Sequence, residues 1–319
     1  MVATVKAFRF FAVGSAALAT MLAALGSWVR INEAGMSCPD WPLCHGVLVP
    51  SMANGVLWEW SHRLIALLLG PMILGAILTG WNVRRRIAGV APALVALAAV
   101  FVAQILVGGA TIHLANSPAS VVVHWATAMA LLATLTTLAI LAILAPPAGQ
   151  RPGPGAASAA YPSAFAALAA LVTACIGAFV SSSRAGLACP AVPACGDGSV
   201  FGTGVLQHAQ MLHRLAAAIF LIVAAYAAWR APRIRGGGAS TFAVAGLALT
   251  VLQITLGIAN VVWLLPMPLR EAHAANAALT FLAFVIAAVL AVIEHLEPVA
   301  AASDRGLSTG AAVYAGPRR

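Results

Sequence analysis

The stretch GSWVRINEAGMSCPDWPLC, residues 26–44, decides the fold, because it returns at residues 177–195 as GAFVSSSRAGLACPAVPAC. The two copies share an Ala-Gly pair, a Cys-Pro pair, a later proline and a second cysteine, all at an offset of 151. Chance similarity between two apolar halves does not place such matches in one register. The repeat continues with His62-Arg63-Leu64 and His213-Arg214-Leu215 at the same offset, and with Gln104, Gly108 and His124 against Gln253, Gly257 and His273 at an offset of 149.

The composition is that of a membrane protein. Of the 319 residues, 62% are hydrophobic and 8% are charged, and the mean hydropathy is +0.98. A soluble domain carries about 25% charged residues. Eight apolar runs are long enough to span a bilayer, which takes about 20 residues. They cover residues 10–30, 60–81, 90–112, 120–144, 162–182, 206–229, 241–264 and 271–293.

The repeat contains four such runs in each copy. Because four is even, both copies insert in the same orientation, which makes a parallel repeat rather than an inverted one. We predict an all-α polytopic membrane protein whose eight transmembrane helices form two tandem, pseudo-symmetric four-helix bundles. A stretch rich in Pro, Gly and Ala near the midpoint predicts a linker. The predicted units are an N-terminal half (1–146), a cytoplasmic linker (147–160), a C-terminal half (161–297) and a cytoplasmic tail (298–319).

The net charge of +9 reflects membrane topology and not a nucleic-acid partner, because most Lys and Arg residues lie in short loops between apolar runs. The positive-inside rule places the more basic side in the cytoplasm. Both termini are therefore predicted to be cytoplasmic and the cysteine loops external, in a bacterial inner (plasma) membrane. The basic side holds 12 of the 17 basic residues: Lys6, Arg9, Arg84–Arg86, Arg151, Arg230, Arg233, Arg235, Arg305, Arg318 and Arg319.

Four of the five cysteines form two C-x5-C pairs in the predicted external loops. An oxidising compartment favours the disulfides Cys38–Cys44 and Cys189–Cys195. Zinc is a weaker alternative, because zinc-binding cysteine pairs are separated by two to four residues. The spacing leaves open whether the disulfides are structural or redox-active. Cys175, inside the fifth apolar run, is predicted to be a packing residue.

Four of the eight histidines are duplicated by the repeat. His62 and His124 lie near the outer ends of the second and fourth helices, and His213 and His273 lie at the equivalent places in the second half. Two imidazoles that face each other across a bundle can hold a haem iron from both sides. Neither half supplies a third or fourth ligand at that depth for another metal, so haem iron is the only metal predicted. Of the histidines without a duplicate, His45 and His295 are assigned no role, whereas His113 and His208 are not expected to be ligands but could still line a site.

An arginine follows one histidine in each half, and a carboxylate precedes it in the first half only. Arg63 and Arg214 are candidates to pair with haem propionates, with an interfacial snorkelling role as the alternative. Glu59 has Gln210 as its counterpart. A charged side chain at membrane depth suggests a functional site. The asymmetry therefore predicts chemistry in the first half and electron transfer in the second.

Taken together, these motifs resemble those of the haem A synthase family over residues 10–293. The resemblance rests on Glu59-x-x-His62-Arg63, His124, the loop Cys38-Pro-Asp-Trp-Pro-Leu-Cys44 and Gln104 with Gly108-Gly109, and on the second set Cys189…Cys195, His213-Arg214, Gln253 and His273. One departure is the second loop, which lacks the Asp and Trp of the first.

The resemblance implies an enzyme that oxidises the C8 methyl group of haem O to a formyl group by successive hydroxylations, giving haem A for terminal oxidases. It implies that His213 and His273 ligate a haem b cofactor. It also implies that His62, His124 and Arg63 flank the substrate haem and that Glu59 is the catalytic carboxylate. The implied partners are haem O, a haem O synthase, cytochrome oxidase assembly factors and the lipid bilayer, and a homo-oligomer is left open.

Two other functions fit the same residues. A bis-histidine membrane cytochrome b would relay electrons from a quinol, and a haem transporter or chaperone would hold haem without changing it. The presence of a carboxylate at Glu59 and its absence at Gln210 favours the enzyme.

Overall fold

The structure is a computed structural model, and it describes residues 2–196, 198–231 and 237–298. Five of the basic residues on which the topology prediction depends lie outside the described residues: Arg233, Arg235, Arg305, Arg318 and Arg319. All of the predicted tail after residue 298 also lies outside them.

The described residues contain eight helices that are long and apolar enough to cross a membrane, which confirms the predicted fold class. Several begin earlier than predicted, because backbone hydrogen bonding continues through polar residues at the membrane boundary that an apolar window excludes. The second helix, for example, already includes Glu59 in its first turn. The helices are α1 (Val2–Ile31), α2 (Val56–Val83), α3 (Val90–His113), α4 (Pro118–Leu144), α5 (Ala156–Ser182), α6 (Val205–Arg230), α7 (Gly238–Val262) and α8 (Met267–Ile293).

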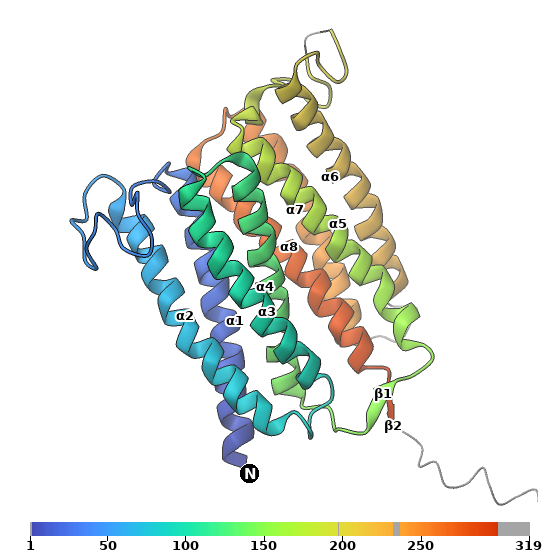
Figure 1. The fold of residues 1–319 in the computed structure, drawn as a ribbon. Coiled ribbons are helices and arrows are strands. Elements are labelled where there is room, and N and C mark those ends of the chain that lie inside the picture. Colours follow the sequence, from blue (N-terminus) through green and yellow to red (C-terminus); the bar gives the residue numbers. More distant parts are fainter. Residues whose placement is uncertain (1, 197, 232–236, 299–319) are drawn as a thin grey trace, which may run out of the picture.

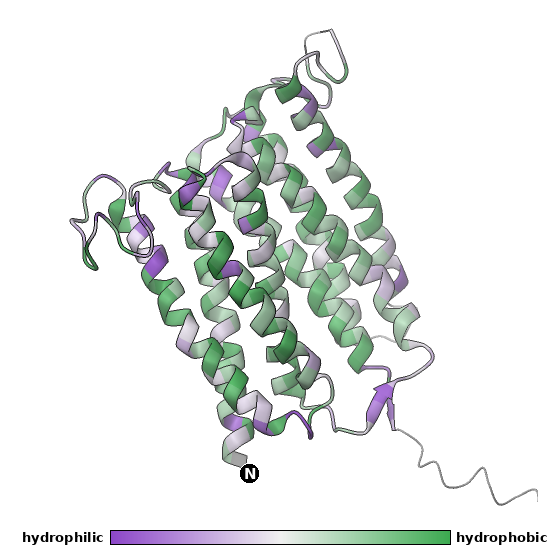
Figure 2. Ribbon diagram, in the orientation of Figure 1, coloured by the Kyte–Doolittle hydropathy of each residue, from purple (hydrophilic) through white to green (hydrophobic). Residues whose placement is uncertain are grey.

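Each half of the chain is a four-helix bundle. In the first half α1 packs against α2 and α4, and α3 packs against α2 and α4. In the second half α5 packs against α6 and α8, and α7 packs against α6 and α8. Figure 1 shows the helices running side by side along one direction, and Figure 2 shows apolar residues along most of their length, with polar residues gathered toward the ends. This pattern is expected of membrane-spanning helices.

The two bundles meet through α1, α4, α5 and α8, the first and last helices of each half. The contacts of α4 with α5 and of α1 with α8 are equivalent under the repeat, and α4 also packs against α8. The main hydrophobic core lies here and includes Leu132, Leu135 and Leu138 of α4 with Phe284 of α8. A pseudo-twofold axis between the halves accounts for these paired contacts.

Side chains at the outer ends of α1 and α5 mark the position of this axis. The guanidinium of Arg30 donates to Ser181 Oγ at 2.8 Å, and these two residues are 151 positions apart and therefore equivalent in the repeat. Glu33 and Arg184, which are also equivalent, form an exposed ion pair with a separation of 3.7 Å. A residue that contacts its own repeat mate must lie beside the symmetry axis.

The connections divide between the two ends of the molecule. The disulfide loops lie at one end, and the N-terminus lies at the other end with the strands β1 (Gln150–Pro152) and β2 (Leu296–Pro298) (Figure 1). These strands pair antiparallel. The region predicted as a linker, 147–160, therefore contains a strand and the first turn of α5. Arg9 donates from Nε to the carbonyl of Ala142 at 3.2 Å, which ties α1 to the end of α4.

Candidate haem sites

The histidine pair of the second half consists of His213 on α6 and His273 on α8. Their ring centroids are 6.4 Å apart and their planes are inclined by 78°. Nδ1 of His213 lies 3.2 Å from the carbonyl oxygen of Thr173 on α5. A carbonyl oxygen only accepts, so Nδ1 must carry the proton, and the neutral ring keeps its lone pair on Nε2. The His213 ring is therefore in the tautomer that binds a metal through Nε2.

This separation suits one metal atom between the two rings. A first-row metal lies about 2 Å from an imidazole nitrogen, so two rings on opposite sides of one ion have centroids about 6 Å apart. Nδ1 of His273 is buried and has no hydrogen-bond partner among the described residues. The chemistry and spacing of the two side chains thus fit an axially ligated haem iron. Within the part of the chain that the structure describes, no group of three or more His, Cys, Asp or Glu side chains is placed to hold a metal ion.

The first half repeats this arrangement with His62 on α2 and His124 on α4. The two rings lie close enough to interact electrostatically, and the backbone of Leu22, the repeat mate of Thr173, lies beside His62. Nδ1 of His124 is 3.3 Å from the side-chain nitrogen of Gln104 on α3. The structure thus brings together both pairs of histidines that the sequence predicted.

The surroundings of the second histidine differ between the halves. Gln104 contacts the ring of His124 directly, and its Oε1 accepts a hydrogen bond from Thr127. In the second half the amide nitrogen of Gln253 instead donates to the backbone carbonyl of His273 at 3.0 Å. Asn276, the repeat mate of Thr127, donates to Gln253 Oε1 at 2.7 Å. Both glutamines therefore position a histidine, but only Gln104 contacts the ring nitrogen.

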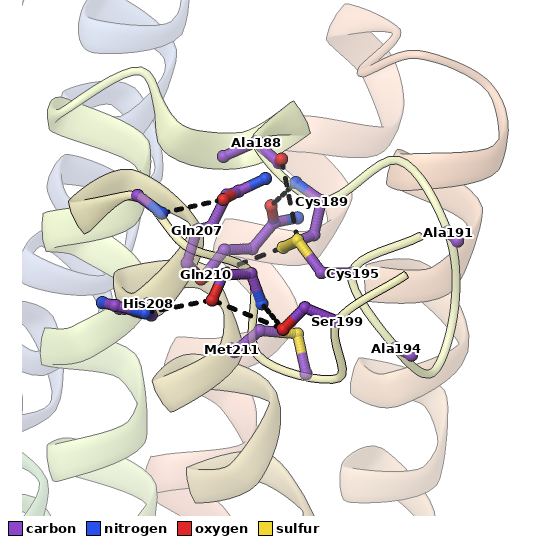
Figure 3. Close-up of a disulfide and its surroundings, with 12 residues drawn as sticks. Ala188, Cys189, Ala191, Ala194, Cys195, Ser199, Gln207, His208, Gln210 and Met211 are labelled. Atoms are coloured by element: carbon purple, nitrogen blue, oxygen red, sulfur yellow. Dashed lines mark hydrogen bonds between the residues drawn. A yellow bond between two sulfur atoms is a disulfide. The ribbon is translucent and has the colours of Figure 1, made fainter. Parts of the chain in front are cut away.

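Glu59 and Gln210 have the same structural role. Glu59 is only 3% exposed, and its Oε2 accepts from the backbone N–H of Cys38 at 2.8 Å and from Ser37 Oγ at 3.0 Å. Gln210 is 4% exposed, and its Oε1 accepts from the backbone N–H of Cys189 at 2.6 Å. Figure 3 shows Gln210 directed at the disulfide loop above α6. Each side chain fastens the first cysteine of its loop to the helix that carries the histidine.

The two arginines bind the loops as well. Arg63 donates from Nη1 to the carbonyls of Asp40 and Leu43 and from Nη2 to that of Cys38, at 2.5–2.9 Å. Arg214 does the same for carbonyls of the second loop, those of Cys189, Ala191, Pro193 and Ala194. Arg63 also forms an ion pair of 2.5 Å with Oε1 of Glu59. The sequence did not predict this loop-binding role, although the recurrence of His-Arg below both cysteine loops was a signal for it.

Both predicted disulfides, Cys38–Cys44 and Cys189–Cys195, are formed, and Cys175 has a free thiol. In both loops the second proline is preceded by a cis peptide bond, Trp41-Pro42 in the first loop and Val192-Pro193 in the second. The sulfur atoms are buried in both loops. The repeat therefore extends to the conformation of the loops.

The first loop has a further polar contact of its own. The Asp40 carboxylate accepts from the backbone N–H groups of Gly46 at 2.8 Å and of His45 at 2.6 Å. These bonds, that of Gly46 above all, hold the pKa of the Asp40 carboxyl below its usual range. The equivalent position in the second loop is Ala191. An acid-sensitive contact is thus present in the first loop.

The unduplicated histidines contact backbone carbonyls or are exposed. Nε2 of His208 is 3.2 Å from the carbonyl of Gly202, so its ring faces the second loop (Figure 3). His45 and His113 are exposed, and Nδ1 of His295 lies 2.8 Å from the carbonyl of Ala291.

The fold and the sites define a class of protein: a duplicated four-helix membrane protein with a half-buried histidine pair beneath a disulfide loop in each half. The chain belongs to the COX15-CtaA family of cytochrome oxidase assembly proteins, whose family model matches residues 9–57 and 52–285.

Curated relatives include three bacterial proteins named Heme A synthase. The protein from Rhodospirillum centenum is 28% identical over 322 residues, covering 85% of each chain. That from Shewanella oneidensis is 27% identical over 309 residues, covering 82% of this chain and 89% of its own. That from Geobacillus thermodenitrificans is 28% identical over 215 residues, covering 65% of this chain and 67% of its own.

Proposed function

We propose that this protein is a haem A synthase, which oxidises the C8 methyl group of haem O to a formyl group. The observation that carries the proposal is the pair of equivalent histidine sites, of which only the first has a carboxylate, Glu59, on the helix of its first histidine. Membership of the COX15-CtaA family and the names of the curated relatives support it.

The second half is proposed to hold haem b between His213 and His273. The 6.4 Å separation of their rings and the tautomer set by Thr173 support this assignment. A haem with two histidine ligands supplies one-electron transfer. The residues of the chain hold it: His213 and His273 bind the iron, and Gln253 fixes α8 by donating to the His273 carbonyl.

The first half is proposed to bind the substrate, with His62 and His124 on either side of haem O. Each of two successive hydroxylations adds the oxygen of a water molecule to the methyl carbon and releases two protons and two electrons, which pass to an external electron acceptor. Loss of water from the resulting diol gives the formyl group. Glu59 lies about one helical turn before His62, and its charge is balanced by Arg63. We assign it to the reaction as the carboxylate that stabilises positive charge at the reacting carbon or takes a proton from attacking water.

The proposed setting is a bacterial inner membrane with both termini in the cytoplasm and both disulfide loops outside. Most of the described basic residues, among them Lys6, Arg84–Arg86 and Arg151, lie in segments at the end of the molecule away from the disulfide loops, which supports this orientation. A haem O synthase and cytochrome oxidase assembly factors are proposed as partners, because haem O has to be delivered and haem A removed.

The test of the function is co-expression with a haem O synthase in a host that lacks haem A. We expect haem A in the pigment extracted from the membranes, identified by chromatography. Recovery of haem O alone would refute the enzyme assignment and leave an electron relay or a haem carrier as the function.

The variant Glu59→Gln tests the carboxylate separately from the loop anchor. Glutamine already makes the equivalent bond to a cysteine N–H at position 210, so the loop should stay in place. We expect conversion of haem O to fall about 100-fold or more, the usual contribution of a general acid or base, while haem b is retained. Glu33→Gln, at a residue with a 78% exposed side chain, is the matched control. Full activity of Glu59→Gln would make Glu59 a loop anchor only.

A further inference from the structure

A glycine lies against each of the four paired histidines. A methyl group added at Gly177 would come 2.7 Å from Cε1 of His213, and one at Gly26 would come 2.9 Å from Cε1 of His62. For Gly257 and His273 the distance is 3.2 Å, and for Gly108 and His124 it is 3.3 Å. All four distances are shorter than ordinary van der Waals contact. The four histidine-facing glycines are Gly26, Gly108, Gly177 and Gly257.

These glycines are not explained by their own helices. Each lies inside a helix, where alanine is more favourable than glycine. None of the four has the positive φ that requires glycine. The repeat keeps all four, although the residues around them have changed. The reason for glycine is therefore the imidazole that packs against it.

A second group lies beside each histidine, and at His213 and His124 this group contacts Nδ1 of the ring. Four residues before each glycine, on the same face of the helix, lies a group that contacts the same histidine. For Gly177 this group is the Thr173 carbonyl, which accepts from His213 Nδ1. For Gly108 it is the Gln104 side chain, which contacts His124 Nδ1. The backbones of Leu22 and Gln253 lie beside His62 and His273, although Nδ1 of these two rings has no hydrogen-bond partner among the described residues.

We infer that the four histidine-facing glycines are positioning residues, which seat the imidazole rings so that Nε2 points into the haem sites. At His213 and His124 a polar group contacts the ring at Nδ1, and at all four sites the glycine leaves room for the Cε1 edge of the ring. This inference rests on the proposed function, because it assumes that the histidines face haem.

The physical effect of a methyl group depends on whether the histidine is bound to iron. An unbound imidazole can rotate about its side-chain bonds to relieve a clash. A ring whose Nε2 is bonded to iron cannot rotate without bending or breaking that bond. Glycine-to-alanine substitutions should therefore weaken haem binding much more than they weaken the fold.

The test is the variant Gly177→Ala, purified after expression with haem available. We expect about tenfold faster loss of haem b, the effect of forcing a side chain off its preferred rotamer. We also expect a shifted low-spin electron paramagnetic resonance spectrum. Gly257→Ala, with its longer contact, should give the same changes to a smaller extent. Unchanged haem retention and an unchanged spectrum in Gly177→Ala would overturn the inference.

Two control variants separate positioning from packing. Gly246→Ala creates an equally close contact of 2.7 Å, but with Phe284. Phe284 is eleven residues beyond His273, about 16 Å along α8. This variant should lower thermal stability without shifting the spectrum. Gly26→Ala, the repeat mate of Gly177→Ala, should leave the haem b spectrum unchanged and raise the KM for haem O. A spectral shift in Gly246→Ala equal to that in Gly177→Ala would also overturn the inference.

The same preparations are assayed for conversion of haem O, which separates this inference from the proposed function. A protein that binds haem b through His213 and His273 but produces no haem A would refute the enzyme and leave the positioning role intact. A protein that does not bind haem would refute both.

Discussion

The first disulfide loop is fastened to its bundle by a carboxylate, and the second is fastened by an amide. Glu59 and Gln210 accept a hydrogen bond from the backbone N–H of Cys38 and Cys189, respectively, at 2.8 and 2.6 Å. In sequence, the replacement of one by the other suggested that only the first half performs chemistry. In three dimensions the two residues share a structural role, and they differ in charge. The difference that remains to be tested is therefore the ion pair between Glu59 and Arg63.

The two halves also differ in the contacts of their histidines and arginines. Both halves hold two histidines between helices, but the contacts of the second histidine differ, since Gln104 contacts the ring and Gln253 contacts the backbone. Both arginines bind loop carbonyls, yet only Arg63 has a carboxylate partner. Duplication thus preserved the contacts that hold the structure together, and the halves diverged in side chains near the rings.

The largest expected difference between the halves is in haem content. His213→Ala should abolish the low-spin haem b spectrum of the purified protein, because one of two axial ligands is lost. His62→Ala should retain that spectrum and lose conversion of haem O. Absorption spectroscopy and pyridine haemochrome analysis measure both, with His208→Ala as the control. Equal loss of haem b in His62→Ala would show that the halves do not have separate roles.

The next largest effect is the difference in stability between variants of the two arginines. Arg63→Ala leaves both the loop carbonyls and the buried Glu59 charge without their partner. Breaking a buried ion pair costs about 3–5 kcal/mol, whereas loss of hydrogen bonds to buried carbonyls costs about 1–3 kcal/mol. Arg214→Ala removes only hydrogen bonds and should destabilise less. Thermal unfolding in detergent compares the two variants.

A double variant tests how much the ion pair between Glu59 and Arg63 contributes to stability. Adding Glu59→Gln to Arg63→Ala removes the unpaired charge and should restore part of the lost stability, to about the level of Arg214→Ala. Such non-additivity is expected for residues in one network. Additive losses in the double variant would mean that the ion pair contributes nothing to holding the first loop.

The smallest expected effect is a pH response confined to the first loop. The pKa of Asp40 is lowered in the folded protein, so its contribution to loop stability is complete above the unfolded value of about 3.9 and is lost as the pH falls through the folded pKa. The amide resonance of Gly46 should titrate with a midpoint below that of an unfolded aspartate. Asp40→Asn should abolish the titration. A titration midpoint at or above the unfolded value would show that the Asp40 carboxylate does not accept these hydrogen bonds in solution.

Much of the site was predictable because it depends on local sequence and on the repeat. The two cysteine pairs were close in sequence, so their disulfides needed no knowledge of the fold. The pairing of His213 with His273 followed from their equal depth at helix ends, and the rings are 6.4 Å apart. The glycines beside them were part of the repeated pattern, but the pattern did not indicate what they contact.

The partners of Arg63 and Arg214 were not predictable in the same way. Their position next to a histidine suggested haem propionates, and that role stays a prediction. Their observed partners are loop carbonyls 20 to 25 residues earlier. Helical side chains lean toward the N-terminus of the helix, which directs both guanidinium groups to the loops. Which carbonyls they meet depends on how each loop folds back over its helix.

The sequence by itself determined that this protein has eight membrane-spanning helices in two equivalent halves, each with a disulfide loop and two histidines. Hydropathy and the internal repeat are properties of the chain, and a bilayer permits few ways to satisfy them. Only the tertiary structure decided that Glu59 and Gln210 have one structural role and that a glycine lies against each paired histidine. Those contacts join separate segments, and their distances are set by helix packing that no local pattern encodes.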